Sequence, residues 1–239
     1  MIDLYYAPTP NGLKVKLFLE EAGLAYCVVP VSLSKGDQFK PEFGAISPNH
    51  KIPVIVDHAP ADGGAPLVLF ESGAILLSLA EKIGRFIPTD VRGRAEVMQW
   101  LFWQMSGLGP MAGQIGYFNV YAQETVPFAI ERYTKETRRL YGVLDRRLAD
   151  REFVAGEFSI ADIACYPWIV PHRGHRQSLA DFPNLSRWFE ALRARPATQR
   201  TYAGVEDVYA IRGAPVAVPK PTTLLATTTG LVASAYANP

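Results

Sequence analysis

The sequence predicts an α/β N-terminal domain followed by an all-α C-terminal domain. Strand-like and helix-like segments alternate up to about residue 83, whereas the periodic segments after about residue 94 are helical. The composition also shifts between these two regions, at Arg85 to Arg94, as at a linker. The 239 residues suffice for a full hydrophobic core and fit one large or two small domains.

The chain begins with a strand, a helix and a second strand. Ile2 to Tyr6 is a short β-rich run and predicts a strand. Asn11 to Gly23 carries apolar side chains at helical spacing and predicts a helix, with Asn11 as its N-terminal cap and Gly23 at its end. Tyr26 to Val31 is again β-rich. A run of this length predicts a parallel strand pair with a right-handed crossover.

The rest of the N-terminal half predicts a hairpin and a second long helix. A weak helix around Pro41 to Ile46 precedes a strand at Pro53 to Asp57. A turn-rich link at residues 59–64 separates that strand from another at Leu67 to Phe70, which is typical of an antiparallel hairpin. Ser72 to Ile83 then shows helical periodicity.

Four helices are predicted in the C-terminal half. They cover Arg94 to about Gly107, Thr125 to Leu148, a segment beginning at Ser159, and Leu185 to Ala194. Ser159 and Asp162 have the spacing of a capping box, in which the serine accepts a free backbone N–H and the acid reaches back.

These elements divide the chain into expected domains at residues 1–85 and 92–205. Residues 206–239 differ in composition: Thr, Ala, Pro and Val dominate, and Lys220 is the only formal charge after Gly213. We expect a loosely packed C-terminal extension there, with a strip laid over the helical domain or a partner subunit as the alternative.

Charge and hydropathy favour no nucleic-acid or membrane partner. The net charge is +1, and the basic residues are scattered. No apolar run reaches the roughly 18 residues that span a bilayer, and the start of the chain has no secretory signal, so a cytoplasmic location is expected. His172 and His175 lack a third ligand, so we expect surface histidines and no metal.

The chain contains two cysteines, Cys27 and Cys165, and no Cys-x-x-Cys pair. Both follow or precede apolar residues, which predicts buried and unreactive thiols. A reaction at sulfur would therefore use the sulfur of a ligand.

Glu71 and Ser72 form the first candidate site, since they come directly before and at the start of a predicted helix. The serine hydroxyl and the free amides of the first turn suit an anion, and the glutamate suits an ammonium group. A plain helix cap with a favourable acid is the alternative.

Five segments resemble a known family when they are taken together. Those around Thr9, Lys51 and Ser72 resemble the glutathione-site motifs of the cytosolic glutathione transferases. With residues 99–104 and 127–133, the set is similar to the bacterial Nu class over about residues 1–203. The resemblance implies the cytosolic glutathione transferase fold, with residues 1–85 as a thioredoxin-like glutathione-binding domain, in a homodimer with its ligand cleft between the domains.

The resemblance also implies roles along the tripeptide. A cis Ile52-Pro53 bond would aim the backbone of Ile52 at the extended ligand, with an ordinary trans proline as the alternative. Gln38 and Lys51 would hold the glycyl end, and Arg132 would clamp a carboxylate. The alternatives are a solvated Lys51, a Gln38 without ligand contact and a surface salt bridge for Arg132.

Thr9 and Asn11 are the expected catalytic residues, on either side of the ligand sulfur. A hydroxyl and an amide N–H both donate to a thiolate, and the helix start adds positive potential. A capping role without ligand contact is the alternative for Thr9. The neighbouring Tyr5 and Tyr6 are expected to pack on opposite faces of the strand.

The implied activity is glutathione-dependent disulfide reduction, with glutathione as co-substrate and small thiols and disulfides as partners. Two glutathiones or one glutathione disulfide would occupy the cleft, without a protein cysteine. Conjugation of glutathione to an electrophilic carbon and non-enzymatic glutathione binding are the alternatives. Gly113 to Asn119 departs from the polar, histidine-bearing stretch of the class, so the substrate range does not transfer.

Overall fold

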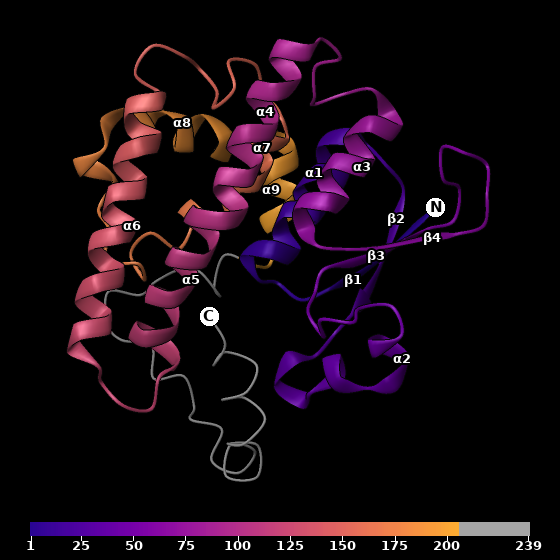
Figure 1. Cartoon of the computed structure of the whole chain (residues 1–239), viewed down its shortest axis with the longest axis horizontal. Helices are drawn as coiled ribbons and strands as arrows, with labels where there is room; N and C mark the ends of the chain where they lie inside the picture. Colours follow the sequence, from indigo (N-terminus) through magenta and orange to yellow (C-terminus); the bar gives the residue numbers. More distant parts are fainter. Residues whose placement is uncertain (206–239) are drawn as a thin grey trace.

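The computed structural model describes residues 1–205 and forms a four-stranded mixed sheet beside a set of helices (Figure 1). The expected extension at residues 206–239 lies outside the described part. The strands are β1 (Ile2–Tyr6), β2 (Tyr26–Pro30), β3 (Val54–Asp57) and β4 (Leu67–Phe70).

The helices follow the strands in the order that the sequence predicts, with two additions. They are α1 (Pro10–Ala22), α2 (Pro41–Gly44), α3 (Ser72–Ile83), α4 (Val91–Trp103), α5 (Gly109–Gly116), α6 (Pro127–Arg147), α7 (Ile160–Ile169), α8 (Pro183–Arg193) and α9 (Pro196–Tyr202). Two π-helical turns, η3 (Gln104–Leu108) and η4 (Tyr117–Tyr121), flank α5. No helix of the described residues is both long and apolar enough to cross a bilayer.

The strand order β2-β1-β3-β4 brings three chain segments to one end of the sheet. β1 pairs parallel with β2, and β3 pairs antiparallel with both β1 and β4, which confirms the predicted parallel pair and hairpin. Tyr5 lies opposite Val54, and Val54 lies opposite Phe70. The residues just after β1, just before β3 and just after β4 therefore meet at this end of the sheet.

The two faces of the sheet are covered differently. Leu4 and Ile55 are fully buried in the main core with α1 and α3, whereas Val54 packs with Phe43 of α2 on the other face. Tyr6 belongs to the main core, and the ring of Tyr5 lies 6.3 Å from that of Phe43. The expectation that these tyrosines face opposite sides is confirmed.

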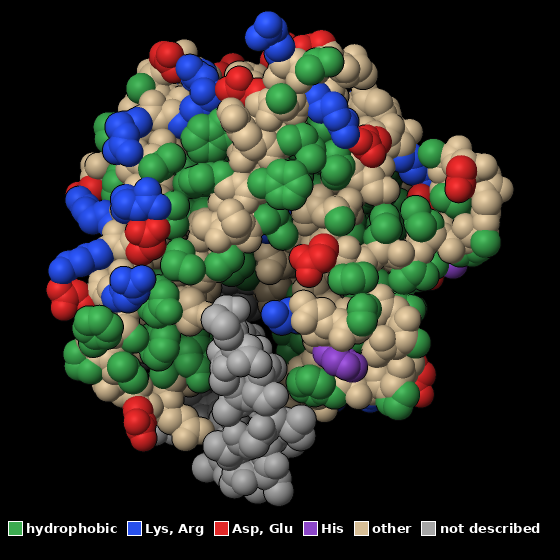
Figure 2. Space-filling model, in the orientation of Figure 1, with side chains coloured by type: hydrophobic (Ala, Val, Ile, Leu, Met, Phe, Trp, Pro, Cys, Tyr) green, Lys and Arg blue, Asp and Glu red, His purple; other side chains and the backbone are tan. Residues whose placement is uncertain are grey.

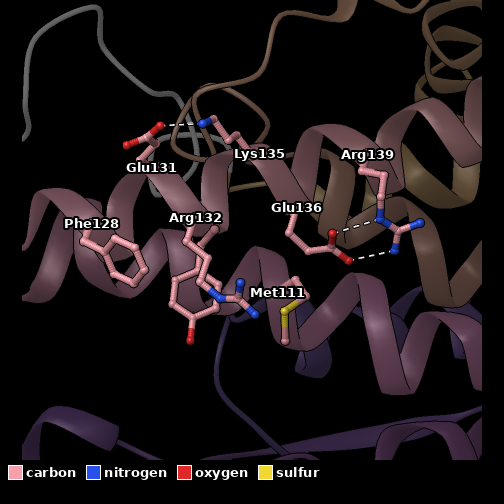
Figure 3. Close-up of a pocket in the computed structure, with 8 residues that line it drawn as sticks. Met111, Phe128, Glu131, Arg132, Lys135, Glu136 and Arg139 are labelled. Carbon is pink, nitrogen blue, oxygen red and sulfur yellow. Dashed lines mark hydrogen bonds and ion pairs between the residues drawn. The ribbon is translucent and has the colours of Figure 1, made fainter.

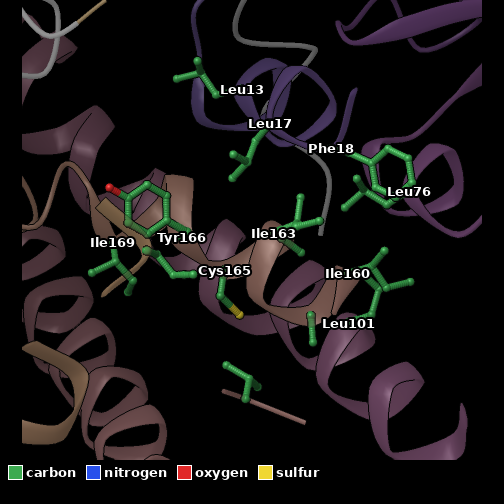
Figure 4. Close-up of a cluster of buried hydrophobic side chains, with 14 of the residues drawn as sticks. Leu13, Leu17, Phe18, Leu76, Leu101, Ile160, Ile163, Cys165, Tyr166 and Ile169 are labelled. Atoms are coloured by element: carbon green, nitrogen blue, oxygen red, sulfur yellow. The ribbon is translucent and has the colours of Figure 1, made fainter. Parts of the chain in front are cut away.

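The α/β part and the helical part share one continuous core (Figure 4). Side chains of α1 and α3 meet those of α4 and α7 there, including Leu13, Leu17, Phe18, Leu76, Leu101, Ile160 and Ile163. A helix that is apolar on all sides is buried, as α7 is here. The predicted capping box at Ser159 and Asp162 is confirmed at its start. The junction of the two parts is therefore packed rather than loosely hinged.

Two sequence-based predictions about the α/β part are wrong. Helix α1 is capped by Thr9, whose Oγ accepts a hydrogen bond from the Gly12 N–H at 3.3 Å, and not by Asn11. Pro10 explains this, because proline suits the first helical position. Cys27 is exposed and not buried, because β2 is an edge strand with mostly exposed side chains.

Candidate functional site

The candidate site lies at the sheet end where the three segments converge. The turn after β1 carries Thr9, the segment before β3 carries Ile52-Pro53, and Glu71 follows β4. The Ile52-Pro53 bond is cis, as expected. Ile52 and Pro53 are both buried, so only the backbone of this segment is suited to contact a ligand at this end of the sheet.

Thr9 and Asn11 lie at the start of α1 with different partners. The Thr9 oxygen caps the helix, which leaves its O–H free to donate. The Asn11 Oδ1 accepts a hydrogen bond from the indole Nε1 of Trp168 at 3.0 Å. An indole N–H only donates, so the atom of the Asn11 amide that faces Trp168 is its oxygen. The N–H₂ group of Asn11 therefore points away from Trp168. Trp168, on α7, is a site residue that the sequence reasoning missed.

The start of α3 combines an exposed acid with a buried hydroxyl. Glu71 is exposed and has a φ of 70°, an uncommon conformation for a residue with a side chain. Ser72 is only 3% exposed. The free N–H groups of the first turn and the helix dipole favour a negative ligand group here. The predicted helix start at Ser72 is confirmed.

Beneath Ser72 lies Lys14, a second residue that the sequence reasoning missed. Its side chain is 1% exposed, and its Nζ lies 3.3 Å from the Ser72 Oγ, 2.6 Å from the Gln104 Oε1 and 3.2 Å from the Met105 Sδ. Burial lowers the pKa of Lys14 to about 7, although Cys165 and Glu71 act in the opposite direction. Gln104 and Met105 come from the π-helical turn η3, an element that often marks functional sites.

Gln38 and Lys51 lie on two loops that are tied to each other. The His50 Nδ1 lies 2.9 Å from the Gln38 carbonyl oxygen, and the Ser47 hydroxyl donates to the Lys51 carbonyl at 2.9 Å. The Lys51 side chain is exposed. The side-chain oxygen of Gln38 is buried and has no hydrogen-bond partner among the described residues.

Arg132 lies apart from this group, in a pocket of about 600 Å³ between α5 and α6 (Figure 3). Its guanidinium lies beside Met111 in the figure. The neighbouring acids have other partners, since Glu131 pairs with Lys135 and Glu136 pairs with Arg139. Within residues 1–205, Arg132 forms no ion pair, and the residues of the sheet end do not line its pocket.

Neither cysteine belongs to the site. Cys165 is fully buried in α7, where burial raises the pKa of its thiol far above the usual range. Cys27 lies in β2, on the far side of β1 from the converging segments. Among the described residues, the converging segments therefore offer donors for a sulfur but no sulfur nucleophile of their own.

The expectation of two surface histidines is wrong for His175. This residue is 3% exposed, and its Nδ1 lies 3.1 Å from the hydroxyl oxygen of Tyr141. Burial lowers the pKa of His175 to about 3, so it is neutral at physiological pH. Its ring stacks on Trp168, the partner of Asn11. In the part of the chain that the structure describes, no group of three or more His, Cys, Asp or Glu side chains is arranged to hold a metal.

Family models and solved structures match this chain over most of its length. The model of the glutathione S-transferase N-terminal domain matches residues 9–82, and that of the C-terminal domain matches residues 113–196. The disulfide-bond oxidoreductase YfcG of Escherichia coli K12 is 60% identical over 199 residues, covering 83% of this chain and 93% of YfcG.

Two solved structures share both the fold and much of the sequence. A glutathione transferase from Pseudomonas putida, with one glutathione disulfide bound per subunit, has a TM-score of 0.80 and 44% identity, covering 84% of this chain and 90% of that one. A glutathione transferase from Burkholderia graminis, with two glutathione molecules bound per subunit, has a TM-score of 0.79 and 45% identity, covering 84% and 86%. The chain therefore belongs to the glutathione S-transferase family.

Proposed function

We propose that this protein catalyses glutathione-dependent disulfide reduction, using the thiols of bound glutathione. The observation that carries the proposal is the convergence of Thr9, Asn11, Ile52 and Ser72 at one sheet end without a cysteine among them. The name of YfcG and the ligands held by the Pseudomonas putida and Burkholderia graminis enzymes support it.

The charged groups of glutathione determine how the tripeptide lies across this end of the sheet. Its γ-glutamyl carboxylate lies at the start of α3 on the Ser72 hydroxyl, and its ammonium lies on Glu71. Its cysteinyl backbone pairs with Ile52, as an added strand pairs with a sheet edge. Gln38 and Lys51 face its glycyl end. The sulfur then lies at the turn that carries Thr9 and Asn11.

The reaction consists of two thiol–disulfide exchanges. The first glutathione thiolate attacks one sulfur of the substrate disulfide, forms a mixed disulfide and releases one substrate thiolate, which takes up a proton. A second glutathione thiolate attacks the glutathione sulfur of the mixed disulfide, which yields glutathione disulfide and the second substrate thiol. Each step breaks one S–S bond and forms another, so no further oxidant or reductant is needed.

Positioning must contribute more to the rate than ionisation of the sulfur. A site that lowers a thiol pKa from about 8.5 to about 6.5 raises the thiolate fraction at neutral pH roughly 25-fold. The lower basicity reduces nucleophilicity by roughly eightfold, so the net gain is only about threefold. Holding two sulfurs in line contributes several kcal/mol in well-oriented reactions.

The double variant Cys27→Ala/Cys165→Ala is expected to retain the wild-type turnover of a small disulfide, because the reacting sulfurs come from the ligands. The measurement is reduction of 2-hydroxyethyl disulfide by glutathione, with a melting curve to show that the buried Cys165→Ala change leaves the fold intact. Loss of turnover in a folded double variant would contradict the ligand-thiol mechanism. Turnover with a chloro-nitroarene that exceeds turnover with the disulfide would favour conjugation instead.

Trp168→Phe is expected to lower kcat/KM about tenfold, because Asn11 loses the donor that orients its amide. A tenfold loss corresponds to about 1.4 kcal/mol, the size of one strong hydrogen bond between neutral groups. The pKa of the bound glutathione thiol, followed by thiolate absorbance, should rise as well. Trp100→Phe is the matched control, since the Trp100 Nε1 is buried without a partner among the described residues. Equal effects of the two changes would remove the assigned role of Trp168.

We further propose a homodimer in the cytoplasm, with domain boundaries at residues 1–85 and 92–205. Exposed apolar side chains support an interface, among them Phe102 on α4 at 61% and Phe70 on β4 at 39% exposure. Hydrophobic side chains gather on the face over these elements (Figure 2), and patches of this kind mark interaction sites. Light scattering of the purified protein measures the oligomeric state directly.

Arg132, without an ion-pair partner among the described residues, is proposed as a carboxylate clamp.

A further inference from the structure

A fully buried lysine lies directly behind the proposed glutamyl subsite. Lys14 sits on α1, one helical turn after Asn11, and reaches across the junction between the α/β part and the helical part. Its Nζ contacts Ser72 at the start of α3 and Gln104 and Met105 in η3. Lysine is almost never fully buried unless it is paired, so this placement calls for a counter-charge.

No carboxylate contacts this ammonium group among the described residues. The hydroxyl, amide oxygen and thioether around the Nζ are all neutral. The ionisable groups near it are Glu71 before α3 and Cys165 from α7; Glu71 favours the charged form, and Cys165 would do so only as a thiolate. The Cys165 thiol stays neutral because burial raises its pKa, and Glu71 is exposed to solvent. Further along α1, Arg195 and Arg200 are paired with Glu21 and Glu20.

We propose that Lys14 is a positioning residue for the γ-glutamyl carboxylate: it orients the Ser72 hydroxyl and takes up a proton when the carboxylate binds. This inference rests on the proposed function. Lys14 donates to the Ser72 oxygen, and the Ser72 hydroxyl donates in turn to the Met105 Sδ at 3.7 Å. A thioether is a weak acceptor, so an anion placed at the helix start would replace Met105 as the acceptor of the Ser72 hydrogen. The carboxylate would then lie one hydroxyl away from the Nζ and act as its missing counter-charge.

Electrostatics determines whether Lys14 takes up or releases a proton when the carboxylate binds. Without ligand, burial holds the pKa of Lys14 near 7, so about half of the molecules carry a neutral amine at pH 7. A bound carboxylate favours the charged form and raises this pKa, so binding takes up protons at neutral and mildly alkaline pH. For each unit by which the ligand raises the pKa of Lys14, the dissociation constant is tenfold larger at a pH above the pKa values of both the free and the bound protein than at a pH below both. Affinity must therefore fall as the pH rises from 6 towards 8.5.

The test uses S-methylglutathione, which keeps the γ-glutamyl group and has no titrating thiol. Titration calorimetry in buffers of different ionisation enthalpy counts the protons taken up on binding. For the wild-type protein we expect uptake of close to half a proton at pH 7 and a dissociation constant about tenfold larger at pH 8.5 than at pH 6. Lys14→Met should bind more weakly at pH 6 and lose most of this pH dependence. Lys16→Met, two residues along α1, is the control and should behave as the wild type does.

The outcomes separate this inference from the proposed function. Wild-type protein that binds S-methylglutathione without proton uptake, or a folded Lys14→Met variant with the wild-type pH profile, would overturn the role of Lys14 and leave the proposed function standing. Wild-type protein that binds neither S-methylglutathione nor glutathione disulfide would overturn the proposed function itself. The wild-type measurement decides the inference even if Lys14→Met fails to fold.

Discussion

Asp162→Ala is expected to lower the free energy of unfolding by about 4 kcal/mol, because it leaves several buried donors without an acceptor. Asp162 is fully buried at the start of α7. Its carboxylate accepts hydrogen bonds from the Val154 N–H at 2.9 Å, the Ser159 N–H at 3.1 Å and the Trp188 indole at 2.8 Å. Urea unfolding followed by fluorescence measures the loss.

Two further variants identify the cause of this loss. Asp162→Asn keeps one acceptor oxygen and the shape of the side chain, so an intermediate loss is expected. Asp90→Ala removes an exposed cap that accepts from the Gly93 N–H, and should cost only about 1 kcal/mol. If Asp162→Ala cost no more than Asp90→Ala, the buried network would not be what holds the start of α7.

The contribution of Asp162 to the stability of the fold changes with pH in a definite direction. Burial raises the pKa of Asp162 to about 6, above its usual value of 3.8. The folded protein therefore holds this proton more tightly than the unfolded chain does. The resulting stabilisation is present below about pH 4 and is lost as the pH rises through about 6. The stability gap between the wild type and Asp162→Ala should accordingly be wider at pH 5 than at pH 8.

The capping box shows which parts of this fold are readable from the sequence. Ser159 and Asp162 act through contacts within one turn, so their spacing alone identified the helix start. The hairpin and α3 were predicted at the residues where the structure places them, or within one residue, because their signals are also local. Pro10 carries an equally local signal, since proline suits the first helical position and so points to Thr9 as the cap of α1.

The segment around residues 104–121 lacked such local signals. It runs through η3, α5 and η4 and contains four glycines, so helical periodicity is weak there. The sequence does not predict helix α9, because Pro196 follows the predicted helix Leu185 to Ala194 and suits its end, whereas it is the first residue of α9. Proline is compatible with both positions, and only the following residues distinguish them.

The two missed site residues depend on tertiary contacts. Lys14 lies among apolar residues of α1, and the sequence does not reveal that η3 closes over it with Gln104 and Met105. Trp168 reaches Asn11 across 157 positions of the chain. Cys27 was placed wrongly for a related reason: its apolar neighbours predict a strand, but the position of that strand at the sheet edge follows only from the topology. Local sequence thus pointed to the residues that are proposed to face the ligand and missed the side chains that contact them.

Gly12→Ala is expected to reduce kcat/KM by at least about 100-fold, since misplacement of a site by 1 Å can have an effect of that size. A Cβ at Gly12 would lie 2.3 Å from the backbone oxygen of Ala7 and 3.0 Å from the Tyr6 ring. Backbone cannot yield as a flexible side chain does, so the turn that carries Thr9 and Asn11 must shift. We also expect a loss of about 2 kcal/mol in stability from overpacking, partly offset by the roughly 1 kcal/mol higher helix propensity of alanine.

Gly116→Ala is the matched control for this prediction, because both glycines lie in helices but only one is crowded. Among residues 1–205, no atom outside the chain neighbours and the backbone of its own helix lies within 4 Å of a Cβ added at Gly116, and its backbone is helical. The change should therefore leave turnover unaltered and raise stability by up to about 1 kcal/mol. Turnover of 2-hydroxyethyl disulfide and a melting curve for each variant measure both effects. A Gly12→Ala enzyme as active as Gly116→Ala would mean that the turn after β1 does not need its present position, and Thr9 and Asn11 would then lose their proposed place in the reaction.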